Sequence, residues 1–151
     1  MIYGASGYTG SLIAREAVRR SLRPILAGRS AGKLSELAGE VNLEHRIFSL
    51  DSPSAVVDGI RGVHTLLNCA GPFSQTARPM AEACLKIGTH YLDITGEARI
   101  FEWLAARDAE AKAAGQGMSV HQADGRPGNI VDTGLVRRQI DDHRVVTRNT
   151  A

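Results

Sequence analysis

Short apolar runs alternate with amphipathic stretches along the first 121 residues of this chain. Each run is soon followed by glycine or polar residues, as buried strands are, whereas the stretches between repeat apolar residues every three or four positions, as helices do. The runs predict six strands, at residues 1–3, 24–28, 45–50, 64–69, 90–94 and 118–121.

Five helices are predicted between these strands. Apolar stripes within residues 13–18, 34–41, 55–60, 79–87 and 100–115 mark them; the first helix starts after the glycine turn, Ser30 and Ser52 are N-cap residues, and Gly88 ends the fourth helix. Repeated strand–helix units predict an α/β fold, a Rossmann-like doubly wound parallel sheet with helices on both faces. Right-handed crossovers restrict the topology, and we expect the strand order 3-2-1-4-5-6.

The first predicted strand leads directly into a glycine-rich turn, residues 4–10. Glycine allows backbone angles that a side chain forbids, and it lets a phosphate approach the free N–H groups of a helix N-terminus. In this strand–turn–helix context the turn predicts a pyrophosphate cradle. The alternative is an ordinary tight turn. The cradle residues would be Gly4, Ser6, Gly7, Tyr8, Thr9 and Gly10.

The residues after the second predicted strand indicate which dinucleotide would bind. An acidic side chain about 20 residues beyond the glycine turn would bind the ribose 2′-hydroxyl of NAD. This chain has Arg29 there, with Ser30 and Lys33 close by. Guanidinium, hydroxyl and ammonium groups suit a 2′-phosphate, so the pattern favours NADP. The alternative is a set of solvated cations at a helix start.

Two further strand ends contribute candidate cofactor residues. Asp51 follows the third predicted strand, where it would either accept a hydrogen bond from the adenine amino group or merely precede the Ser52 cap. Asn68, Ala70 and Gly71 follow the fourth, where small residues would let the ribose and nicotinamide lie against the backbone. Cys69 is interpreted as a small buried residue rather than a nucleophile.

The fifth strand offers the catalytic candidates. Tyr91 and Asp93 share one face of it, because side chains alternate along a strand, and this polar face would meet the nicotinamide or substrate. The alternative, compatible with the first, is a helix start with Thr95 as cap and Glu97 favouring the helix dipole. No tyrosine has a lysine four residues later, which excludes the proton-transfer pair of short-chain dehydrogenases.

Composition excludes several function classes. The net charge of +2 gives no field that would attract nucleic acid, and no apolar run reaches the roughly 18 residues of a membrane span. The histidines and the two cysteines do not share metal-ligand spacing, so no metal site is expected. Few cysteines and no basic, apolar leader predict a reduced, cytoplasmic setting.

Several segments together resemble the NADP-binding domain of the saccharopine dehydrogenase-like family, which includes the trans-acting enoyl reductases. They are YGASGYTG, LAGRS, LLNCAGPFSQ and EACLKIGTHYLDITGE, and the resemblance runs from Ile2 to about Gly115. It implies this fold, NADP as cofactor and an oxidoreductase ancestry. It places cofactor contacts at Gly4, Ser6, Gly7, Tyr8, Thr9, Gly10, Arg29, Ser30, Asn68, Ala70 and Gly71, with residues 91–97 at the mouth of the active site.

The resemblance breaks down at both ends of the chain. Family members have more apolar residues before the glycine turn and continue into a substrate domain after the sixth strand. We therefore expect a binding domain over residues 1–122 with a short first strand, and a partly helical tail over 123–151 without a substrate domain. Such a truncated chain would bind NADP(H) without turning over its small-molecule substrate alone.

Two other functions are compatible with the sequence. One is a non-enzymatic nucleotide-binding or protein-interaction module, whose tail covers the sheet or pairs two chains as a homodimer. The other is a gene product that keeps the fold and has lost its function, because a fold does not imply a function.

Overall fold

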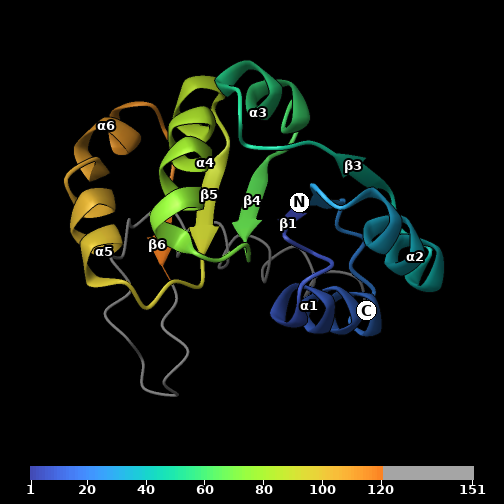
Figure 1. Ribbon diagram of the computed structural model, residues 1–151. Coiled ribbons are helices and arrows are strands. Elements are labelled where there is room, and N and C mark those ends of the chain that lie inside the picture. Colours follow the sequence, from blue (N-terminus) through green and yellow to red (C-terminus); the bar gives the residue numbers. More distant parts are fainter. Residues whose placement is uncertain (121–151) are drawn as a thin grey trace, which may run out of the picture.

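Six short parallel strands form the centre of the computed structural model, which describes residues 1–120 (Figure 1). They pair side by side in the order β3-β2-β1-β4-β5-β6. The predicted fold class and strand order are confirmed. The strands are β1 (Ile2–Tyr3), β2 (Leu26–Gly28), β3 (His45–Ile47), β4 (Thr65–Asn68), β5 (His90–Asp93) and β6 (Met118–Val120).

Helices cover both faces of this sheet. They are α1 (Tyr8–Arg19), α2 (Ala31–Val41), α3 (Pro53–Gly59), α4 (Phe73–Ile87), α5 (Ala98–Ala105) and α6 (Asp108–Ala113). Side chains alternate along the strands, so Ile2 and Leu26 pack with α1 and α2, whereas Tyr3 and Ala27 join the larger core with α3 to α6. Figure 1 shows the two groups of helices well separated.

The register of the central strands sets the level at which they end. Tyr3 pairs with Ala27 on one side and with Asn68 on the other, and Asn68 pairs with Asp93. The loops after β1, β2, β4 and β5 therefore leave the sheet at one edge. Because the strand order reverses between β1 and β4, this edge carries the switch point where doubly wound folds bind ligands.

Two predicted helix boundaries are wrong. The helix predicted from Pro79 begins at Phe73, because Glu97 Oε1 accepts a hydrogen bond from the Phe73 N–H and so satisfies a free donor of the first turn. The single helix predicted to run to Gly115 is interrupted after Ala105. A tight turn closes there, where the Arg107 N–H donates to the carbonyl oxygen of Leu104.

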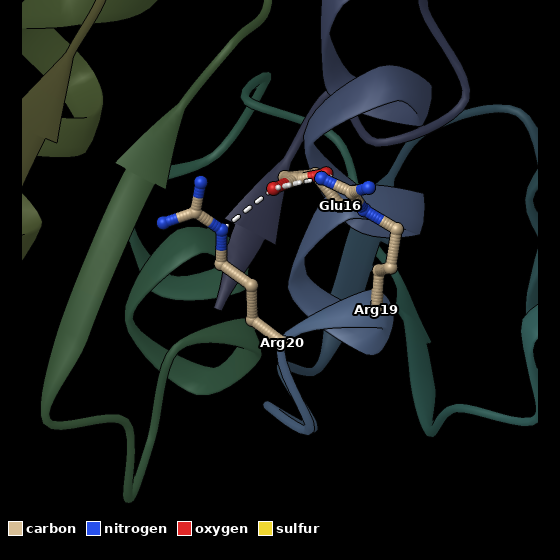
Figure 2. Close-up of polar contacts among 3 residues, drawn as sticks. All are labelled: Glu16, Arg19 and Arg20. Carbon is tan, nitrogen blue, oxygen red and sulfur yellow. Dashed lines mark hydrogen bonds and ion pairs between the residues drawn. The ribbon is translucent and has the colours of Figure 1, made fainter.

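The C-terminal end of α1 carries an exposed ion-pair cluster (Figure 2). Glu16 Oε2 accepts a hydrogen bond from Arg19 Nε at 2.8 Å, and Glu16 Oε1 accepts one from Arg20 Nε at 2.6 Å. These two guanidinium groups lower the pKa of Glu16 to about 2. The cluster lies on the solvent side of the helix. It therefore affects how the stability of the protein depends on pH and takes no part in the packing of the core.

Two expectations concern residues beyond this description. The domain boundary at 122 and the tail over 123–151, with its proposed helix and its pairing role, lie outside the described residues. Within residues 1–120, no helix has the length and apolar character to cross a membrane.

Candidate functional site

A cleft of about 550 Å³ opens at the carboxyl edge of the sheet, over the ends of β1, β2 and β4. Its size falls within the range of small-molecule and cofactor sites. Most of the sequence-predicted cofactor residues line it: Gly4, Ser6, Gly7, Arg29, Ser30, Lys33, Asp51, Ala70 and Gly71. Tyr8, Thr9, Gly10 and Asn68 do not line it.

The glycine turn forms the floor of the cleft. Gly4 has φ +77, and a Cβ atom on it would lie 2.8 Å from the backbone nitrogen of Ala70. A Cβ on Gly10 would lie 2.3 Å from the carbonyl oxygen of Gly4. Side chains are therefore excluded at both positions, and the turn after β1 packs directly on the loop after β4.

Helix α1 begins directly after this turn, and its N-cap residue, Gly7, lines the cleft. Gly7 occupies the N-cap position, where no side chain makes a cap hydrogen bond, and the first turn holds no acidic residue. The first N–H groups of a helix have no partner within the helix, and they carry its positive dipole end. An anion seated on this turn would meet the positive end of the helix dipole, which is the environment that a pyrophosphate requires.

Cationic groups stand at the end of the cleft formed by β2 and α2. Arg29, Ser30 and Lys33 are all exposed there. Ser30 takes the predicted N-cap position of α2, yet its hydroxyl makes no cap hydrogen bond. Within residues 1–120 neither Arg29 nor Lys33 forms an ion pair. The side chains of Arg29 and Lys33 are therefore exposed to solvent and could pair with an anion.

The carboxylate of Asp51 shares this end of the cleft. Burial raises the pKa of Tyr3, whose side chain also lines the cleft; the charge of Arg29 opposes that rise and the charge of Asp51 adds to it. Arg29 and Asp51 thus act on the same hydroxyl, from the loops after β2 and β3. A ligand here would meet the two cations, Arg29 and Lys33, and one carboxylate, that of Asp51.

The catalytic candidates lie beneath the cleft and do not line it. Tyr91 is fully buried and Asp93 is 1% exposed. The Tyr91 hydroxyl donates a hydrogen bond to Asp93 Oδ2 at 2.8 Å, as their shared strand face predicts. Burial raises the pKa of Asp93 to about 6 and that of Tyr91 well above its usual value. Neither group can touch a molecule in the cleft in this conformation.

Cys69 lines the cleft but is poorly suited to nucleophilic chemistry. Burial, with a smaller effect from the charge of Asp93, raises the pKa of its thiol to about 11. The thiolate is the reactive form, and it is scarce at neutral pH when the pKa is this high. The raised pKa agrees with the interpretation that Cys69 is not a nucleophile, although the residue is only partly buried and lines the cleft.

Residues 1–118 match the family described as the saccharopine dehydrogenase NADP binding domain. The chain belongs to this family. A saccharopine dehydrogenase-like oxidoreductase of Mus musculus is 27% identical in an alignment over 157 residues, gaps included, that covers 90% of this chain and 36% of that protein. A trans-acting enoyl reductase of Mycobacterium ulcerans is 31% identical over 106 residues, covering 64% of this chain and 25% of that enzyme.

Solved structures agree on the fold of this saccharopine dehydrogenase-type domain. The apo saccharopine dehydrogenase of Saccharomyces cerevisiae superposes with a TM-score of 0.67 at 15% identity, covering 95% of this chain and 31% of that one. The triphenylmethane reductase of Citrobacter sp., in complex with NADP(H), gives 0.59 at 18% identity, covering 79% and 47%. The chain spans about a third of the length of the mammalian relatives that it matches.

The structure adds cleft residues to this domain that the sequence interpretation missed. Ser49 and Leu50 were assigned to the third strand, but β3 ends at Ile47 and they belong to the loop after it. Gln75 and Thr76 lie in the first turn of α4, which the sequence interpretation placed before the helix. The polar residues Ser74, Gln75 and Thr76, which follow Gly71-Pro72-Phe73, were the available signal for the second pair.

Proposed function

We propose that this chain binds NADP(H) in the cleft and supplies the cofactor-binding part of an oxidoreductase. One observation carries the proposal: an uncapped helix N-terminus behind a glycine turn shares a single cleft with Arg29 and Lys33, which have no ion-pair partner among the described residues. The family match and the NADP(H) complex of the Citrobacter reductase support it.

Each part of the dinucleotide has a group suited to it. The glycine turn, residues 4–10, would hold the pyrophosphate on backbone N–H groups. Arg29, Ser30 and Lys33 would bind the 2′-phosphate, and Asp51 the adenine amino group. The small residues Ala70 and Gly71 would leave room for the nicotinamide half.

Hydride transfer is the chemistry that the bound cofactor would supply. The residues of this chain would bind the cofactor, orient it and exclude water from one of its faces. Because the chain spans about a third of its mammalian relatives, we assign reduction of a small-molecule substrate to the whole oxidoreductase and cofactor binding to this domain. Steady oxidation of NADPH by this chain alone, with a substrate, would contradict that division.

Calorimetric titration with NADP and separately with NAD tests the proposal. We expect NADP to bind more tightly, and Arg29→Ala to weaken NADP by about ten- to a hundredfold while leaving NAD unchanged, because charge-assisted hydrogen bonds to the 2′-phosphate are lost. Arg99→Ala removes an equally exposed arginine from α5 and serves as the matched control. Equal affinities for both cofactors, or an equal loss in the control, would contradict the assignment.

A further inference from the structure

Side chains of β4 and β5 form a chain of hydrogen bonds beneath the cleft. The Tyr91 hydroxyl donates to Asp93 Oδ2 at 2.8 Å, and it accepts from Asn68 Nδ2 at 3.2 Å. The other end of the Asn68 amide, Oδ1, accepts from the Ala70 N–H at 3.0 Å. This series of hydrogen bonds therefore runs from the buried Asp93 carboxylate to the backbone of Ala70, which lines the cleft.

A second arm leaves the same carboxylate through the loop after β5. Asp93 Oδ1 accepts from the Thr95 N–H at 3.2 Å, and Thr95 Oγ1 accepts from the Glu97 N–H at 3.1 Å. Glu97 Oε1 then accepts from the Phe73 N–H at 2.9 Å, at the start of α4. The two arms hold the segment 70–73 at both of its ends.

The two arms do not touch the cleft themselves. Asn68, Tyr91, Asp93 and Thr95 are each at most 1% exposed, and neither they nor Glu97 line the cleft. Segment 70–73 does line it, through Ala70, Gly71 and Pro72. Buried polar networks with every member satisfied fix a single conformation, so these side chains would act on a ligand only through the segment that they hold.

A cross-link ties the segment to α4 as well. Thr76 Oγ1, in the first turn of α4, donates to the carbonyl oxygen of Ala70 and accepts from Asn68 Nδ2 at 3.2 Å. Ala70 also abuts the glycine turn, since a Cβ on Gly4 would meet its backbone nitrogen. A shift of segment 70–73 would therefore reshape the cleft wall next to the proposed pyrophosphate cradle.

We propose that Tyr91, Asp93 and Glu97 are positioning residues, which hold segment 70–73 in the shape that receives the nicotinamide half of the dinucleotide. This inference rests on the proposed function for its ligand. It assigns the polar face of β5 a role in cofactor affinity without contact to the cofactor. The adenine half, at the opposite end of the cleft beside Arg29, is independent of the network.

Tyr91→Phe tests the first arm, because it removes one hydroxyl and keeps the ring. We expect this variant to bind NADP about three- to tenfold more weakly, the effect of one lost hydrogen bond, and to bind adenosine 2′,5′-bisphosphate as the parent does. Thr89→Val is the matched control: Thr89 is 2% exposed, directly precedes β5, and its hydroxyl donates to the Val63 carbonyl oxygen away from the cleft. Unchanged NADP affinity in Tyr91→Phe, or an equal loss in Thr89→Val, would overturn the inference.

The second arm is tested by loss and rescue at one position. We expect Glu97→Ala to weaken NADP and Glu97→Gln, which keeps the Oε1 acceptor, to restore most of the affinity. Amide hydrogen exchange in the free protein gives a readout without ligand: exchange at Ala70 and Phe73 should quicken in Tyr91→Phe and Glu97→Ala respectively, and not in Thr89→Val. Absence of NADP binding by the parent chain would refute the proposed function alone, whereas unaltered exchange at both amides would refute the positioning network.

Discussion

Replacing Gly10 by alanine tests whether the glycine turn is as tightly packed as the structure shows. Gly10 is the third residue of α1 and is buried. An added Cβ would lie 2.3 Å from the Gly4 carbonyl oxygen and 2.8 Å from the Ala5 Cα atom. Both are backbone atoms, so no flexible side chain can move aside. Relief would require the turn and α1 to separate.

The expected loss of stability follows from two opposing effects. Alanine is favoured over glycine within a helix by about 1 kcal/mol. Overpacking of a filled site costs about 1–3 kcal/mol or more, and a contact of 2.3 Å between backbone and Cβ belongs at the upper end. The clash therefore prevails, and we expect Gly10→Ala to lower the free energy of unfolding by about 2 kcal/mol. Affinity for NADP should fall with it, because the cradle shifts.

Urea unfolding of Gly10→Ala beside a matched control variant measures this change in the free energy of unfolding. Gly39 is an exposed glycine of α2, and a Cβ there would have no atom within 4 Å. Gly39→Ala should therefore stabilise the protein by about 0.5–1 kcal/mol through helix propensity alone. If Gly10→Ala proved as stable as Gly39→Ala, the close packing of the turn would be refuted.

Three further predictions rest on separate features. The folded-state pKa of Glu16, about 2, lies below its usual value of 4.5. Its stabilising contribution is therefore present at neutral pH and disappears as the pH falls from about 4.5 to 2. Acid unfolding of Glu16→Gln should lack that part of the pH dependence. With a pKa of about 11 instead of the usual 9.0, the Cys69 thiol should react with iodoacetamide at pH 8 about a hundredfold more slowly than an unperturbed cysteine thiol, and an equal rate would contradict the burial. Excess NADP should raise the melting temperature of the chain, because a ligand of the folded state stabilises it, and identical melting curves would argue against binding.

The order of strands and helices could be predicted because each has a local pattern. Gly88, for example, ends α4 with φ +81, as its place after an apolar stripe indicates. The start of α4 could not be predicted, because the carboxylate that accepts a hydrogen bond from the Phe73 N–H belongs to Glu97, 24 residues away. At the break after Ala105, the Arg107 guanidinium lies 3.6 Å from the Glu82 carboxylate of α4, which is 25 residues away in the sequence. Contacts between elements decide both boundaries, and no local pattern encodes them.

The candidate site divides in the same way. The place of Gly4 in the cleft, where the backbone itself forms the surface, could be predicted from spacing, and so could that of the exposed Arg29. Both follow a strand end directly, and the strand end fixes where they lie. Whether a polar side chain at a strand end faces the cleft or the core depends on the layers above it. Asn68, Tyr91 and Asp93 face the core, where each finds a hydrogen-bond partner in another.

Mapping the amide shifts of the ¹⁵N-labelled chain during titration with NADP tests the central claim most directly. We expect the largest changes on the glycine turn, residues 4–10, and on the cleft residues Arg29, Ser30, Lys33, Ala70 and Gly71. We expect small changes on α5 and α6, which contribute no residue to the cleft lining. Shifts centred on those helices, or none at saturating cofactor, would contradict the assignment of this cleft as the NADP site.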